Sequence, residues 1–145
     1  MKKFEFSLGR VMDYRETLER LEESKLQTLY AELRGIEARE AELKDQRARN
    51  ERAVLDAKSA TGTELAALDS FRRFAVAEHT RLERKRAECV KKIESQIQVV
   101  TLKRRDVRSL EKLRAARMIA WRRKADREID MHAEEAYLTK WNRQA

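Results

Sequence analysis

Apolar residues recur every three or four positions along most of the chain, with one interruption at "KSATGTEL", Lys58–Leu65. This spacing is that of one face of an α-helix. It continues over many heptads with charged residues elsewhere, which predicts a coiled coil. Before the interruption the stripe consists of Leu26, Leu29, Leu33, Ile36, Leu43 and Val54, with Val11, Leu18 and Leu21 in a shifted phase. After it the stripe consists of Leu65, Leu68, Ala75, Leu82, Cys89, Ile93, Val100, Val107 and Leu110.

The interruption reads as a short turn between two helices. Thr61 followed by Glu64 fits a capping box, in which each side chain accepts a hydrogen bond from the other residue's backbone N–H. Gly62 can end the preceding helix in the left-handed conformation. We therefore expect a helix over about 8–59, a turn at about 59–63 and a helix over about 64–141. A short turn makes the helices antiparallel neighbours, so the predicted fold is all-α: one long antiparallel two-helix coiled-coil hairpin with unequal arms, spanning 1–145.

The composition agrees with long helices. The chain has no proline and three glycines among 145 residues, and 41% of its residues are charged. Disorder is the alternative for so charged a chain, but the regular apolar spacing opposes it. Several polar residues fall where the seam between the helices should be apolar, and such residues weaken a coiled coil while helping to fix its register. The sequence leaves more than one register open, because these positions include Glu40, Arg47, Asn50, Arg86 and Gln96.

The second helix is predicted to extend beyond the end of the first. Folding about residue 61 places Leu8 beside residue 115, and the chain beyond that point has no internal partner except residues 1–7. The residues expected to lack a partner include Met118, Trp121, Met131, Tyr137, Leu138 and Trp141. Two readings of Trp121 stay open: it anchors another protein, or Phe4 and Phe6 fold over it.

Positive charge gathers in the same region. The net charge is +8, and Leu102–Arg127 holds eleven Lys or Arg against three Asp or Glu. This stretch is either a solvated face or a surface for an acidic partner. Nucleic acid is disfavoured as that partner, because the cations are spread around the helix and no reading motif is present. A membrane surface is also disfavoured, since the apolar face of this helix is thin.

The residues that carry out catalysis or hold cofactors are not recognisable here. There is no glycine-rich phosphate loop, and His79 and His132 have no second ligand at metal spacing. Cys89, the one cysteine, is predicted to be a small buried apolar residue. We expect a non-enzymatic protein without cofactor or metal. Without an apolar run of membrane length or a secretory signal, we also expect it to be cytoplasmic.

The two ends of the chain carry distinctive patterns. The opening "FEFSLGRVMDYRE" has the pattern Phe4-x-Phe6-x-Leu8-x-x-Val11 followed by Arg15, and the second stretch, "LEKLRAARMIAWRRKADREIDMHAEEAYL", begins at Leu110. Together they resemble the beginning and the ending of the flagellar export protein FliJ family. Trp121 falls where the family usually has tyrosine, and Glu128 and Glu134 match later acidic positions. Ala133 departs from the aspartate usual before the last Glu. The resemblance extends over the whole chain in length and layout.

This resemblance implies a function. FliJ-like proteins are antiparallel coiled-coil hairpins similar to the central stalk of rotary ATPases, in the cytoplasmic part of the flagellar type III export apparatus. Their terminal end enters the export ATPase ring, a surface near the turn contacts the export gate protein in the membrane, and they escort export chaperones. For this chain we expect a monomer that reaches the membrane only through partners. The ring-binding candidates are Arg114, Arg117, Trp121, Arg122, Arg123 and Lys124.

The candidates for the export gate are Phe71, Arg72 and Phe74. If Leu68 and Ala75 define the seam, the two phenyl rings cannot both face it, so at least one should be exposed. The alternative is that both rings pack under Val54 and Leu55 to close the tip of the hairpin.

Three other functions remain open. The chain could be the equivalent stalk of a virulence type III secretion system, a general coiled-coil scaffold that dimerises through its seam, or a basic nucleic-acid-binding hairpin. Self-association separates the scaffold from the stalk, and a shift of DNA or RNA at physiological salt identifies the nucleic-acid binder.

Overall fold

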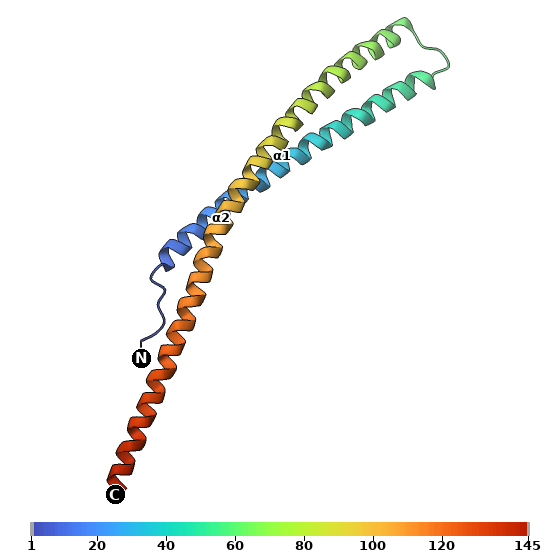
Figure 1. Ribbon diagram of the computed structural model, residues 1–145. Coiled ribbons are helices and arrows are strands. Elements are labelled where there is room, and N and C mark those ends of the chain that lie inside the picture. Colours follow the sequence, from blue (N-terminus) through green and yellow to red (C-terminus); the bar gives the residue numbers. More distant parts are fainter. Residues whose placement is uncertain (1, 145) are drawn as a thin grey trace. The chain divides into compact units, whose positions relative to one another are not determined.

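The protein is an all-α helical hairpin, seen here in a computed structural model that describes residues 2–144 (Figure 1). Helix α1 spans Gly9–Leu55 with 47 residues, and α2 spans Gly62–Gln144 with 83. No strand occurs within the described range. The predicted fold class, two unequal helices joined by one turn, is confirmed. Residues 1 and 145, which the predicted hairpin includes, lie outside the described range.

The connection between the helices contains the predicted capping box. The Glu64 N–H donates to Thr61 Oγ1 at 3.2 Å, and the Thr61 N–H donates to Glu64 Oε2 at 3.2 Å. The predicted boundaries are less accurate. Helix α1 ends at Leu55 rather than 59, and α2 runs from Gly62 to Gln144 rather than from 64 to 141. Gly62 has no positive φ, so it opens α2 and does not end α1 in the left-handed conformation.

The described chain divides into two compact units, and both helices pass through each of them. We call Leu21–Val100 the tip unit, because it contains the connection between the helices. The terminal unit consists of the described residues up to Arg20 together with those from Thr101 onward. The division falls within the two helices and not at the loop, so each unit is an antiparallel pair of helical segments.

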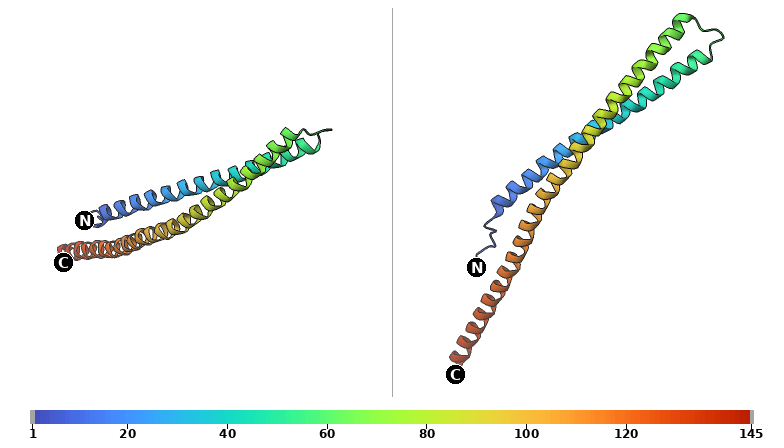
Figure 2. Two further views of the ribbon diagram at one scale, coloured as in Figure 1. Left: turned by 90° about the horizontal axis from the view of Figure 1, so that it is seen from above. Right: turned by 45° about the horizontal axis from the view of Figure 1, so that its top comes forward.

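The core of the tip unit follows the predicted stripes. In the views of Figures 1 and 2, the cyan part of α1 and the green part of α2 run beside each other. Leu82 is 3% exposed, and burying a leucine in this way contributes about 1.5–3 kcal/mol. Leu65 departs from the prediction, because it is 51% exposed in the first turns of α2. The buried cluster comprises Ile36, Leu43, Ala75, Leu82, Cys89 and Ile93, with Leu26, Leu29, Tyr30, Leu33 and Phe71 packed against it.

Polar residues at seam positions pair across the two helices. Arg86 NH1 lies 3.5 Å from Glu40 Oε2, and Arg86 NH2 lies 3.6 Å from Glu37 Oε1. The Gln96 amide donates to the Glu22 carboxylate at 2.7 Å and to the Glu22 carbonyl oxygen at 2.9 Å. A shift of one helix past the other would separate these partners, so they select one register among those that the sequence allows.

The terminal unit pairs the first turns of α1 with the part of α2 that follows Thr101. Arg15 NH1 lies 3.2 Å from Asp106 Oδ2. Ser7 contacts Arg117, close to the expected pairing of Leu8 with residue 115. The predicted early stripe is correct only in part, because Leu18 is half-buried, whereas Val11 is 44% and Leu21 52% exposed and Met12 is buried in place of Val11.

Helix α2 extends beyond the start of α1, as the apolar pattern predicts. Ala125 is buried at 5% exposure, and every described residue from Asp126 to Gln144 is exposed. We call this segment the overhang; it forms the red end of α2 in Figure 1. Its exposed apolar residues are Ile129, Met131, Tyr137, Leu138 and Trp141. Among the described residues, no second helix covers this end of α2.

Candidate functional site

The basic residues predicted to bind a partner lie on α2 near its overhang. We call Arg114, Arg117, Arg122, Arg123 and Lys124 the basic collar; all five are exposed. Within residues 2–144, four of them make no ion pair and no side-chain hydrogen bond, Arg117 being the exception. Cations without carboxylate partners are free to meet acidic groups of another molecule.

Trp121 lies in the same part of α2 but is partly covered. Residues 2–8, which we call the strap, precede α1. The ring centroid of Phe4 lies 6.0 Å from that of Trp121, with an angle of 58° between the ring planes. Both side chains are half-buried. Of the two readings of Trp121 that the sequence left open, the structure contains the intramolecular contact.

Arg117 holds the strap at a second point. Its guanidinium carbon lies 5.6 Å from the centroid of the Phe6 ring, a cation–π arrangement. Its NH1 group also donates a 2.7 Å hydrogen bond to Ser7 Oγ. The six predicted ring-binding residues therefore fall into two groups. Arg117 and Trp121 contact the strap, whereas the other four side chains, those of Arg114, Arg122, Arg123 and Lys124, are exposed; Arg114 also lines a cavity of about 340 Å³ beside Phe6.

The two phenylalanines predicted to bind a partner, Phe71 and Phe74, also differ in their environment. Phe71 packs against the buried cluster, whereas Phe74 is 50% exposed, and their ring centroids are 6.2 Å apart. The expectation that at least one ring is exposed is confirmed. The alternative, with both rings packed under Val54 and Leu55, is wrong, because the Phe74 side chain is 50% exposed and Leu55 is 81% exposed. Arg72 is 3.3 Å from Glu51 of α1, so it braces the helix pair beside Phe74.

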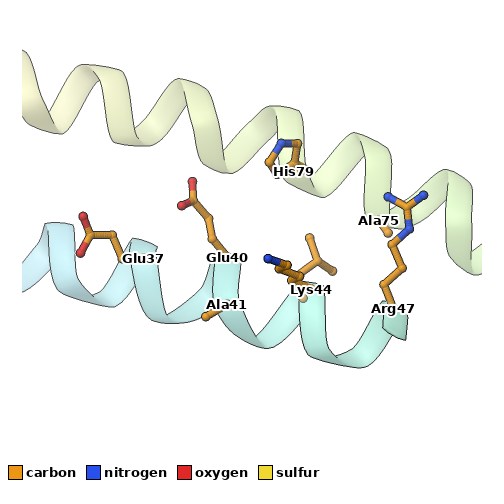
Figure 3. Close-up of a pocket in the computed structure, with 8 residues that line it drawn as sticks. Glu37, Glu40, Ala41, Lys44, Arg47, Ala75 and His79 are labelled. Atoms are coloured by element: carbon orange, nitrogen blue, oxygen red, sulfur yellow. The ribbon is translucent and has the colours of Figure 1, made fainter. Parts of the chain in front are cut away.

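A groove between the helices of the tip unit was not predicted from the apolar pattern. It has a volume of about 450 Å³ and is lined by Glu37, Glu40, Ala41, Leu43, Lys44, Arg47, Ala75 and His79. Figure 3 shows Glu40 extending from α1 towards α2, where His79 lies. His79 pairs with Glu83 at 3.1 Å, and both groove carboxylates pair with Arg86. The two groove carboxylates, His79 and Arg47, which pairs with Glu51, are thus already engaged within the protein.

Cys89 is buried, as predicted. Its Sγ lies 3.5 Å from the Leu29 carbonyl oxygen, and burial raises the pKa of the thiol above 9.0. A buried thiol with a raised pKa is a poor nucleophile at neutral pH, so the side chain serves packing.

Two surfaces of the described structure are therefore candidates for engaging another molecule: the basic collar with the neighbouring Trp121, and the segment from Phe71 to Phe74 in the tip unit. No cluster of three or more His, Cys, Asp or Glu suited to a metal ion occurs among residues 2–144. None of the helices in that range has an apolar stretch long enough to cross a membrane. Comparison with protein-family models, with curated proteins and with solved structures gave no match for this chain.

Proposed function

We propose that this chain is a non-enzymatic stalk and adaptor of the flagellar type III protein export apparatus. In this role the terminal unit inserts into the ring of the export ATPase. The proposal combines the resemblance of both chain ends to FliJ-like proteins with one structural observation. That observation is an α2 end that outlasts α1 and carries four exposed cations with no carboxylate partner within the described chain.

The physical argument concerns how a rod enters a ring. A long-range attraction between a basic rod end and acidic ring residues raises the association rate, and salt screens it. Three consecutive cations, Arg122, Arg123 and Lys124, with Arg114 earlier on the same helix, supply such a field. The apolar residues of the overhang then provide short-range contact once the end has entered. The reaction itself belongs to the ATPase, and the stalk supplies shape and charge.

A second surface fits the adaptor part of the role. Phe74 is exposed and Phe71 is half-buried near the loop, with Arg72 between them in sequence. An aromatic and an arginine beside each other are typical of the residues that dominate protein interfaces. We assign this surface to the export gate protein. The chain would therefore act at the cytoplasmic face of the membrane, held there by its partners, and would escort export chaperones.

The decisive experiment is a binding and ATPase assay with the export ATPase of the same organism. The test variant is R122E/R123E/K124E, which reverses three collar charges without altering Arg117 or Trp121, the residues that hold the strap. The control is R84E/K91E/K92E, which makes the same charge change in the tip unit at exposed residues. We expect wild type and control to bind and to stimulate assembly or hydrolysis, and the collar variant to lose both.

Three results would contradict the proposal. The first is a wild-type chain that neither binds the ATPase nor changes its rate at low salt. The second is equal loss of binding in the collar variant and the control, which would mean that net charge matters and the collar does not. The third is a shift of DNA or RNA at physiological salt that the collar variant abolishes, which favours the nucleic-acid-binding hairpin.

A further inference from the structure

The face of α2 that packs on α1 continues past the start of α1. Met118, Trp121 and Ala125 are at least half-buried, although α1 begins only at Gly9. Phe4, Phe6 and Leu8 of the strap are half-buried in turn. The strap thus occupies the place on α2 that a continuing helix would have taken, and it does so without being a helix.

The strap is attached by side chains and hardly at all by its backbone. Residues 2–6 belong to no helix or strand, and no backbone hydrogen bond joins residues 2–5 to another described residue. The backbone of the strap is anchored where the strap meets α1: the Gly9 N–H donates to the Phe6 carbonyl oxygen at 2.9 Å, and the Met12 N–H donates to the Leu8 carbonyl oxygen at 2.9 Å. What remains is the Phe4–Trp121 ring contact and the two contacts of Arg117 with Phe6 and Ser7. Few contacts therefore have to break for the strap to leave.

The strap and the collar also carry net charge of the same sign. Lys2 and Lys3 precede Phe4 and Glu5 follows it, so the strap is net positive, while Arg122, Arg123 and Lys124 immediately follow Trp121. The ring contact between Phe4 and Trp121 therefore brings two groups of like charge near each other. Repulsion of this kind weakens an association that is otherwise aromatic. A segment that has the same aromatic residues but acidic neighbours would attract the collar where the strap is repelled.

We infer that the Arg117–Trp121 face is a peptide-binding surface that the strap covers, and that its occupant in a complex is an acidic partner segment with aromatic residues two positions apart. Phe4 and Phe6 of the strap show the spacing of the rings that this face accepts. The strap and the partner segment exclude each other, because both need the Trp121 ring and the Arg117 guanidinium. The inference rests on the proposed function in that both place a partner at this end of α2.

Trp121 can report occupancy directly. The chain has two tryptophans, and the second, Trp141, is 62% exposed in the overhang. In a full-length W141F background all tryptophan fluorescence arises from Trp121. F4A/F6A in that background removes both strap rings, and K2D/K3D instead replaces the like charges by opposite ones. Circular dichroism checks that both variants keep the helical content of the parent.

The probes are synthetic peptides. One has the sequence of residues 2–8, a second carries K2D and K3D, and a third carries F4A and F6A. With the F4A/F6A chain we expect the K2D/K3D peptide to shift Trp121 emission at the lowest concentration and the unaltered peptide at a higher one. The peptide without rings should have no effect. The parent chain should need about 2- to 10-fold more peptide than the F4A/F6A chain, because its own strap competes for the surface through one aromatic pair.

Two outcomes would overturn the inference. One is that the peptide without rings acts as well as the K2D/K3D peptide. The other is that F4A/F6A and K2D/K3D change the quenching of Trp121 by acrylamide in the same direction, since the first should raise it and the second should lower it.

Binding to the export ATPase then separates the inference from the proposed function. If the peptides behave as expected but no variant binds the ATPase, the surface stands and the proposed function fails. If the ATPase binds wild type and F4A/F6A equally, the proposed function stands and the competition between strap and partner fails.

Discussion

The side-chain amide of Gln96 donates hydrogen bonds to both the carboxylate and the backbone carbonyl of Glu22, at 2.7 and 2.9 Å. Gln96 stands at a seam position of α2, where the heptad pattern calls for an apolar residue. The Gln96 side chain on α2 is therefore hydrogen-bonded to Glu22 of α1 at two atoms. This arrangement gives the tip unit a register marker that an apolar residue could not supply.

Removing this link should cost stability. Q96A leaves the half-buried Glu22 carboxylate without its Gln96 donor, and we expect the free energy of unfolding to fall by about 1–2 kcal/mol. Denaturant unfolding followed by circular dichroism measures it. The control is Q98A, because Gln98 is exposed two residues away and should tolerate the change within about 0.5 kcal/mol. Equal stability of Q96A and Q98A would show that the link contributes nothing.

The two phenylalanines of the tip unit should separate stability from binding. F71A removes a ring that packs on the buried cluster, so we expect a loss of about 2 kcal/mol in thermal or denaturant unfolding. F74A removes a ring that is 50% exposed and should change stability by less than about 0.5 kcal/mol. In the proposed adaptor role, F74A alone should still weaken binding to the cytoplasmic part of the export gate. A stable F74A variant that binds as well as wild type would remove Phe74 from that surface.

Cys89 should be inert in the folded protein. Burial raises the pKa of its thiol above the ordinary 9.0, so the native chain should react slowly with thiol reagents at pH 8 and quickly in denaturant. The stability that corresponds to this shift is fully present below pH 9 and is lost as pH rises towards the folded-state pKa. C89A should therefore flatten the fall of stability above pH 9. Native reactivity equal to that of a free thiol would contradict the burial.

Glu78 should produce a pH effect at the acidic end. A hydrogen bond from Arg81 lowers the pKa of the Glu78 carboxyl below 4.5, with smaller electrostatic help from Arg81, Arg39 and Lys85. The corresponding stability is present above pH 4.5 and disappears as pH falls through the lower folded-state pKa. The drop in unfolding midpoint between pH 6 and pH 3 should thus be smaller in E78Q than in wild type. A drop of the same size would mean that the Arg81 contact is not maintained in solution.

Local signals predicted most of the fold. Thr61 and Glu64 specify their own hydrogen bonds, and the stripe from Leu26 to Ile93 follows from periodicity alone. The end of α1 was harder to predict. Residues 56–59 include good helix formers, but Leu55 is already 81% exposed, so further turns would have nothing to pack against.

The candidate surfaces were predicted only as sets of residues. That Arg117 belongs with the strap, and not with the free cations, depends on Phe6 and Ser7, which lie about 110 positions earlier in the chain. The partner of Gln96 is 74 positions away, and periodicity carries no information about pairing at that separation. The excess of Lys and Arg in this part of the sequence predicted the collar. It did not indicate which of these cations make contacts within the protein.

The antiparallel pairing also orders the contacts by the length of chain that each one closes. Arg72 and Glu51 are 21 residues apart, Cys89 and Leu29 are 60, Arg15 and Asp106 are 91, and Arg117 and Ser7 are 110. Closing a longer loop costs more entropy, while each contact formed shortens the loop left for the next. The contacts between the helices should therefore form first near the loop and last near the strap, and they should break in the reverse order. Hydrogen exchange would begin at the strap and the first turn of α1, and a force that pulls the two ends apart would open the pairs one at a time.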